Sequence, residues 1–224
     1  MSAEYFAALR QHMVAEITAE TIYASAQVGK AALDERVMEV MGKVVRHEFV
    51  PLELRPYAYA NVPLPIGFGK TISQPFIVAL MTHLLDIRAE DTVLEIGTGL
   101  GYQAAILVEL ARKVYSIEII AELAHEAKQR LSRQGYTNIE LRIGNGYHGW
   151  PEHAPFDKVI VTAGPDLIPP PLIYQLKAGG KMVIPAGLPD AQQLILVEKD
   201  RNGRVTTKEI LRVRFSQLEG AELG

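Results

Sequence analysis

The hydrophobic and polar positions divide the chain into three zones. Residues 1–60 are rich in Ala, Met and Glu with few turn residues, which predicts a helical extension. Within it, Asp34 is the predicted N-cap of a helix over the stretch ERVMEVMGKVV. The apolar face of that helix consists of Val37, Met38, Met41, Val44 and Val45. In residues 61–90, the segment PLPIGFGKTISQP presents polar side chains just before the helical spacing of FIVALMTHLLDI.

The third zone, residues 91–224, alternates short β-branched runs with helical ones. The predicted strands are TVLEI, KVYSI, IELRI, KVIVT and KMVIPA, with helical segments between most of them. This alternation predicts a doubly wound, mostly parallel α/β sheet. Two more strands flank Asn202-Gly203, a dipeptide typical of hairpins, so the sheet is expected to end in an antiparallel pair. No linker or repeat interrupts residues 1–224, which predicts a single domain.

Composition narrows the function classes. The chain has 224 residues with 48% hydrophobic content, enough for one large core. It has no cysteine, which excludes disulfides, thiolate metal sites and cysteine nucleophiles. The six histidines lack metal-ligand spacing, and no metal site is expected. No apolar run reaches the roughly 18–20 residues that cross a bilayer, and the N-terminal residues lack signal-peptide features, so we expect a cytoplasmic protein without membrane contact. The formal charge of −3 disfavours nucleic-acid binding.

Candidate chemistry lies where the first core strand ends. The strand VLEI runs directly into Gly97-Thr98-Gly99-Leu100-Gly101 and then into a helix. Glycines at this place let the backbone approach a ligand closely, and ligands of such sheets bind at the carboxyl ends of the strands. A dinucleotide fingerprint would require a small residue at position 102, where this chain has Tyr102. The alternative ligand is S-adenosylmethionine, which has no pyrophosphate, and Glu95 would then face its amino end.

A second acidic residue supports an adenosine ligand. Glu118 ends the predicted strand KVYSI, 21 residues after Gly97. An acidic side chain at that position can accept hydrogen bonds from both hydroxyls of a ribose. The competing interpretation is a solvated carboxylate at a helix start, which the helix dipole also favours. The glycine loop and Glu118 together favour the adenosine ligand.

Several motifs resemble the protein-L-isoaspartate O-methyltransferase family. They are DERVMEVMGKVVRHEFVP, PLPIGFGKTISQP, VLEIGTGLGYQAA, APFDKVIVTAG and IPPPLIYQLKAGGKMVIPAG, with a weaker match at Phe215. The resemblance implies a Rossmann-like class I methyltransferase fold over the core, residues 91–224, with residues 1–60 as a helical cap and residues 61–90 as a substrate and lid segment. It implies methyl transfer from S-adenosylmethionine to the free α-carboxylate of L-isoaspartyl residues in damaged proteins and peptides. The chain is expected to act as a monomer.

The resemblance also implies roles for individual residues. It gives Ser73 the catalytic position. The implied substrate contacts are Ile66, Gly67, Thr71, Ile72, Val161, Thr162, Ala163 and Phe215. With the glycine loop and Glu118, the predicted cofactor contacts are Ile72, Ser73, Gln74, Pro75, Glu95, Gly97, Thr98, Gly99, Leu100, Gly101, Glu118, Ile119, Asn145, Gly146 and Thr162. A carboxylate is already ionised at neutral pH and needs no general base. Uncharged donors such as Thr71 and Ser73 suit it better than a strong cation, which would make its oxygen less nucleophilic.

Two positions depart from the family pattern. Asn145 stands where the family usually has an aspartate that contacts the adenine amino group, and its side-chain oxygen can still accept that hydrogen bond without charge. Asn61 likewise replaces a common aspartate. The alternatives are therefore a weakly catalytic relative that binds the cofactor, and a methyltransferase for another carboxylate or a small molecule. The sequence gives no role to Lys70.

Overall fold

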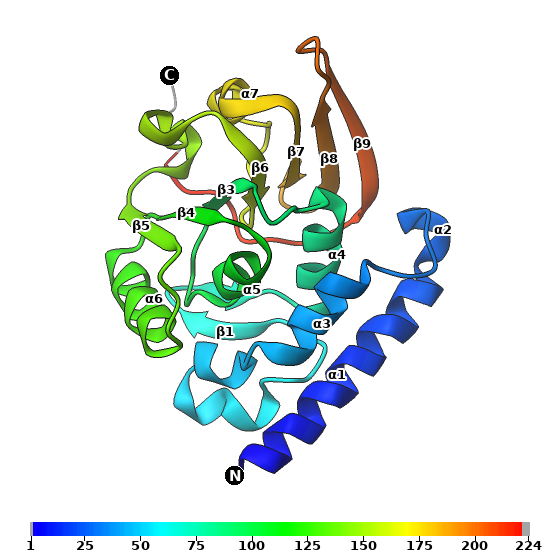
Figure 1. Cartoon of the computed structure of the whole chain (residues 1–224), viewed down its shortest axis with the longest axis vertical. Helices are drawn as coiled ribbons and strands as arrows, with labels where there is room; N and C mark the ends of the chain where they lie inside the picture. The colour runs from blue at the N-terminus through cyan, green and yellow to red at the C-terminus, as the bar shows by residue number, and fades with distance from the viewer. Residues whose placement is uncertain (1, 221–224) are drawn as a thin grey trace.

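A seven-stranded sheet forms the centre of the computed structural model, which describes residues 2–220 (Figure 1). Its strands, in the spatial order β5-β4-β3-β6-β7-β8-β9, are β5 (Ile139–Ile143), β4 (Lys113–Glu118), β3 (Thr92–Ile96), β6 (Phe156–Val161), β7 (Leu176–Ala186), β8 (Gln193–Lys199) and β9 (Val205–Arg212). The strands from β5 to β7 run parallel, whereas β8 is antiparallel to both neighbours. The predicted fold, with its antiparallel C-terminal strands, is confirmed.

Helices cover both faces of this sheet, and strand residues alternate between the two cores. One face packs against α4 (Pro75–Leu85), α5 (Tyr102–Leu110) and α6 (Ala121–Arg133). The other face packs against α7 (Pro170–Gln175) and the short 3-10 helices η3 (Gly146–His148) and η4 (Pro151–His153). No helix within residues 2–220 is long and apolar enough to cross a membrane.

The N-terminal segment is helical, as predicted. It forms α1 (Ala3–Tyr23), α2 (Ser25–Val28), α3 (Glu35–Lys43), η1 (Arg46–Phe49) and η2 (Leu52–Tyr57). Asp34 is the N-cap of α3, and its side chain accepts a hydrogen bond from the Arg36 N–H at 2.8 Å. Val40 is buried in addition to Val37, Met41 and Val44, whereas the predicted face members Met38 and Val45 are only half-buried. The cap packs on α4 and α5 through α1 and α3 (Figure 1).

The segment PLPIGFGKTISQP is a β-hairpin, where the sequence pattern showed only an apolar loop. Strands β1 (Leu64–Gly67) and β2 (Lys70–Ile72) pair antiparallel. The turn residues Phe68 and Gly69 have φ values of 53° and 69°, the left-handed conformation that two-residue hairpin turns require. At the start of β2, the Lys70 ammonium contacts the Glu219 carboxylate at 2.5 Å. Lys70 therefore joins this hairpin to the segment that contains Glu219.

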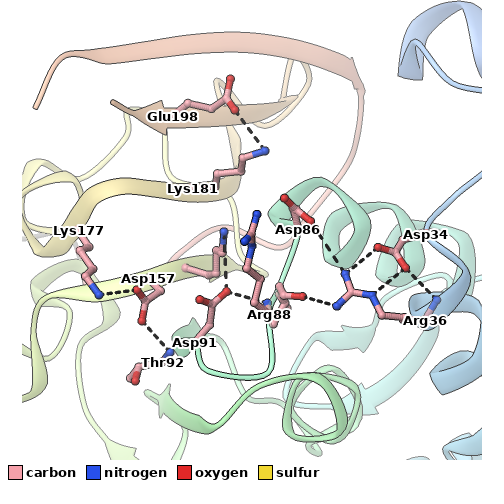
Figure 2. A network of polar contacts seen from close by, with 12 residues as sticks. Asp34, Arg36, Asp86, Arg88, Asp91, Thr92, Asp157, Lys177, Lys181 and Glu198 are labelled. Atoms are coloured by element: carbon pink, nitrogen blue, oxygen red, sulfur yellow. Dashed lines mark hydrogen bonds and ion pairs between the residues drawn. The ribbon is translucent and has the colours of Figure 1, made fainter. Parts of the chain in front are cut away.

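Polar contacts fasten the amino edge of the sheet, as Figure 2 shows. The Asp157 carboxylate accepts hydrogen bonds from the Thr92 N–H at 2.9 Å and from the Lys177 ammonium at 2.8 Å. The Asp91 carboxylate accepts one from the Arg88 N–H at 2.8 Å. The bond from Thr92 to Asp157 joins the starts of β3 and β6, and the bond from Lys177 adds the start of β7. The cavities described below lie at the opposite, carboxyl edge.

The chain returns across that carboxyl edge after β9. Figure 1 shows the red segment running from β9 past the central strands toward the β5 side. Gln217 forms a parallel bridge with Gly164, and the Leu218 N–H donates to the Gly164 carbonyl at 3.1 Å. The Asn145 amide donates to the Gly220 carbonyl at 2.5 Å. Residues 216–220 thus lie over the ends of the parallel strands.

Candidate active site

The glycine loop after β3 is shaped by close approach to β6. Gly97, Gly99 and Gly101 have φ values of 93°, 56° and 98°, which side chains rarely allow. A Cβ atom on Gly97 would lie 2.5 Å from the Thr162 hydroxyl oxygen. That hydroxyl donates to the Gly97 carbonyl at 2.7 Å, which ties the ends of β3 and β6 together. Position 97 therefore requires glycine for both conformation and space.

Glu118 is held at the end of β4 by two backbone donors. Its Oε2 accepts a hydrogen bond from the Gly99 N–H at 2.8 Å, and its Oε1 accepts one from the Ile120 N–H at 3.0 Å. The residue is only 6% exposed, and the remaining exposure is to a cavity. Each carboxylate oxygen keeps a free lone pair after accepting one bond. Glu118 is therefore a fixed acceptor on a cavity wall.

Three adjoining cavities open at this edge of the sheet. The strand-end cavity, of about 580 Å³, lies between the ends of β3 and β4 and residues 216–219. The inner cavity, of about 390 Å³, lies between the glycine loop and β2. The outer slot, of about 750 Å³, lies between Ser73 and residues 212–216. Thr71 and Thr162 line all three cavities, so these two hydroxyl-bearing residues mark the junction.

Most of the predicted site residues line these cavities. Those in the walls of the strand-end cavity are Ile66, Thr71, Gly97, Gly99, Glu118, Ile119, Gly146, Thr162 and Ala163. The inner cavity adds Ile72, Ser73, Thr98 and Leu100. The outer slot adds Gln74 and Phe215. Residues from six separate segments of the sequence thus meet in one place.

Six predicted residues lie outside these walls, and their predicted contacts remain untested. They are Gly67, Pro75, Glu95, Gly101, Asn145 and Val161. Val161 is a fully buried strand residue, and Pro75 is the first residue of α4. Gly101 is the N-cap of α5, where an added Cβ would lie 3.2 Å from the Leu131 side chain.

Glu95 points away from the cavities, into the core beneath α5. Its side chain is 0% exposed, and the Ser116 hydroxyl donates to its Oε2. The Ser116 oxygen also lies 2.6 Å from the Thr98 hydroxyl in the glycine loop. The other carboxyl oxygen, Oε1, has no hydrogen-bond partner within the described residues. Burial raises the pKa of Glu95 to about 8, so the carboxyl holds a proton at neutral pH. Here Glu95 supports the loop, where the sequence prediction had it face the ligand.

Asn145 caps a turn beside the strand-end cavity. Its side-chain oxygen, which was predicted to accept an adenine amino hydrogen bond, accepts the Tyr147 N–H at 2.9 Å. Its amide nitrogen donates to Gly220, while the neighbouring residues Gly144 and Gly146 line the cavity. The amide group is therefore turned toward the C-terminal segment. Aspartate at this position would lack the donor for the Gly220 carbonyl.

Ser73 is positioned by a buried arginine. Arg46 is 0% exposed; its Nη2 donates to the Ser73 carbonyl at 2.8 Å, and its Nε donates to the Ala58 carbonyl at 2.7 Å. The guanidinium lies over the Tyr102 ring, 4.7 Å from the centroid. Burial lowers the pKa of Arg46 to about 10, which still leaves it charged at neutral pH. Arg46 therefore fixes the backbone that presents Ser73, and nothing in the sequence pattern indicated this.

Asn61 joins the same segment to α1. Its amide donates to Glu20 at 2.5 Å, and its oxygen accepts the Phe76 N–H at 2.9 Å at the start of α4. Gln74 also donates to the Glu20 carboxylate, at 3.1 Å. An aspartate at position 61 would bring a second carboxylate against Glu20. Asn61 therefore suits this position better than aspartate, because Glu20 of α1 already places a carboxylate there.

The family of the chain follows from comparison with known proteins. A family model described as protein-L-isoaspartate(D-aspartate) O-methyltransferase matches residues 18–223. The chain belongs to this family. Among curated relatives, protein-L-isoaspartate O-methyltransferase 1 of Polaromonas sp. strain JS666 is 71% identical, with 100% of this chain and 95% of the relative covered. Protein-L-isoaspartate O-methyltransferase 2 of Syntrophobacter fumaroxidans is 59% identical, with coverage of 96% and 87%.

Solved structures agree with the isoaspartate methyltransferase fold. One protein-L-isoaspartate O-methyltransferase has a TM-score of 0.76 at 28% identity, with 89% of this chain and 66% of that chain covered. A Plasmodium falciparum structure, described as this type of methyltransferase in complex with S-adenosyl-L-homocysteine, has a TM-score of 0.75 at 21% identity. The two chains are covered to 91% and 97%. The second likeness concerns the fold alone. The predicted family and class I methyltransferase fold are confirmed.

Proposed function

We propose that the protein transfers a methyl group from S-adenosylmethionine to the free α-carboxylate of L-isoaspartyl residues in damaged proteins and peptides. Membership of the isoaspartate methyltransferase family makes the chain an S-adenosylmethionine-dependent enzyme of protein repair. The observation that supports placing this reaction at the cavities is that Thr71 and Thr162 lie where the cavities meet. These residues belong to the walls of the strand-end cavity and of the outer slot alike. A methyl donor in the strand-end cavity and a carboxylate acceptor in the outer slot would meet at these two residues.

The residues around the strand-end cavity fit S-adenosylmethionine, which when bound supplies a methyl group on a sulfonium sulfur. Glu118 offers two fixed oxygens for the ribose hydroxyls, and the glycine loop brings backbone close to the ligand. Ile96, Ile117 and Ile119 give an apolar wall suited to adenine.

The outer slot fits a peptide carboxylate. The acceptor oxygen is already an anion at neutral pH, so the site needs no general base. Thr71 and Ser73 can hold it with uncharged hydroxyl donors, which leave its charge available for attack on the methyl carbon. Rate enhancement then comes from proximity and orientation. Arg46, buried behind Ser73, supplies the rigidity that such positioning requires.

We further propose that one domain of one chain suffices for this activity. The described walls of all three cavities are built from this chain, and the monomeric state is proposed from the sequence. Residues 1–60 would serve as the cap, residues 61–90 as the substrate and lid segment, and residues 91–224 as the core. A cytoplasmic location rests on the sequence alone. Light scattering after size exclusion would test the first point, and cell fractionation the last.

Site-resolved mass spectrometry tests the proposed function. The protein is incubated with S-adenosylmethionine and a peptide that contains one L-isoaspartyl residue. One methyl group should be added, and fragmentation should place it on the isoaspartyl α-carboxylate. Binding of S-adenosylhomocysteine without any methylated peptide would favour a weakly catalytic relative. Methylation of other carboxylates in the peptide would favour a different acceptor.

A further inference from the structure

The outer slot has walls of opposite character. One wall carries uncharged polar residues, Thr71, Ser73, Gln74 and Thr162. The other is the segment from Arg212 to Ser216, which contributes two guanidinium groups. Among the described residues, no acidic side chain lines the slot. The slot therefore has a formal charge of +2 in a chain whose net charge is −3.

The arginine wall has a fixed backbone. The Val213 N–H donates to the Gln192 carbonyl at 3.1 Å, and the Phe215 N–H donates to the Gln192 side-chain oxygen at 2.6 Å. Gln192 is only 1% exposed, so these two hydrogen bonds tie residues 213–215 to a buried residue. Arg212 and Arg214 are both exposed and flank Val213. Both arginines line the outer slot.

Arg212 and Arg214 also line a second hollow beside the outer slot. A neighbouring hollow of about 650 Å³ is lined by Pro189, Asp190, Arg212, Val213 and Arg214. The Arg212 Nη2 donates to the Asp190 backbone carbonyl at 2.5 Å, whereas Arg214 forms no hydrogen bond or ion pair with residues 2–220. No carboxylate in that described part lies within 4.0 Å of either guanidinium. An extended peptide with its acceptor residue near Ser73 would place flanking residues along these two hollows.

We propose that Arg212 and Arg214 form an anion subsite that recognises an acidic side chain flanking the isoaspartyl residue of the substrate. This inference rests on the proposed function. Guanidinium groups bind carboxylates through paired hydrogen bonds, which suits aspartate or glutamate side chains. The hydroxyl donors near Ser73 serve the acceptor carboxylate, and the arginines select the sequence around it. The protein thus prefers isoaspartyl sites in acidic sequence contexts.

Matched peptides test the subsite. Isoaspartyl peptides are compared that differ only by Glu or Gln two residues from the isoaspartyl residue, on its amino side in one pair and on its carboxyl side in another. Ion pairs between exposed side chains are weak. We therefore expect the Glu peptide in at least one of the two peptide pairs to have a kcat/KM about 2- to 5-fold above that of its Gln partner. In Arg214→Gln and Arg212→Gln, this ratio should fall toward one. In Arg204→Gln, an exposed arginine at the tip of the β8–β9 hairpin, it should stay unchanged.

Three results would overturn the subsite. The first is equal kcat/KM for Glu and Gln peptides in both pairs. The second is a Glu preference that persists in both Arg212→Gln and Arg214→Gln. The third is a loss of kcat/KM by the same factor with Glu and Gln peptides, which would mean that the arginines bind the acceptor carboxylate itself. Failure to methylate any isoaspartyl peptide would instead refute the proposed function, so the two failures are distinguishable.

Discussion

Replacing Glu118 by glutamine should weaken cofactor binding in proportion to the ribose contacts we propose. In the structure, Glu118 accepts the Gly99 N–H at 2.8 Å and the Ile120 N–H at 3.0 Å on separate oxygens. Glutamine keeps the shape but has only one oxygen. A hydrogen bond to a charged acceptor is worth about 1 kcal/mol more than one to a neutral acceptor. With two ribose hydroxyls, the loss is about 1–2 kcal/mol, which raises the Kd roughly 5- to 30-fold.

Isothermal titration with S-adenosylhomocysteine measures this loss in Glu118→Gln. The matched control is Glu122→Gln, an exposed glutamate in the first turn of α6, which should change the Kd by less than about twofold. Urea unfolding of both variants separates binding from stability, because the unpaired N–H in Glu118→Gln should also lower the unfolding free energy by about 1–3 kcal/mol. A Kd for Glu118→Gln within twofold of the unmodified protein would refute a direct ribose contact.

Other substitutions test the supporting residues. Ser73→Ala should lower kcat up to about 100-fold in a steady-state methylation assay, with little change in cofactor Kd; a Kd that rises as much as kcat falls would overturn its assigned role. Asn61→Asp should lower the unfolding free energy by about 1 kcal/mol in urea, because two carboxylates would meet, and adding Glu20→Gln should restore it. Burial raises the pKa of Glu95 from 4.5 to about 8, so the folded protein keeps a proton that the unfolded chain loses, and the unfolding free energy should fall as pH rises through this window. Glu95→Gln should flatten that fall, and a parallel pH profile for both proteins would contradict it.

The periodic parts of the fold were predictable from the sequence. The runs TVLEI and IELRI coincide with β3 and β5, since each is a short β-branched stretch between helical patterns. The Asp34 cap was also predictable, because a helix N-terminus has a local side-chain signal. The hairpin of β1 and β2 was not, since its strands are short and rich in glycine and proline. Its turn depends on Phe68 adopting a positive φ.

The site was predictable where function imposes a local motif. The glycine loop, Glu118 and Ser73 line the cavities, but the orientation of Glu95 could not be read from VLEI, because a strand buried on both faces has no polar alternation. The contributions of Arg46, Arg212 and residues 216–219 arise from contacts between distant segments. No local pattern encodes such contacts, and only the folded chain brings them together.

The most direct test of the central claim is a comparison of two isomeric peptides. One contains L-isoaspartate and the other contains L-aspartate at the same position, and formation of S-adenosylhomocysteine is followed with each. We predict turnover with the isoaspartyl peptide and none above background with the aspartyl peptide, because the outer slot is proposed to admit the α-carboxylate that only the isoaspartyl linkage leaves free. Equal turnover with both peptides would contradict the proposed function.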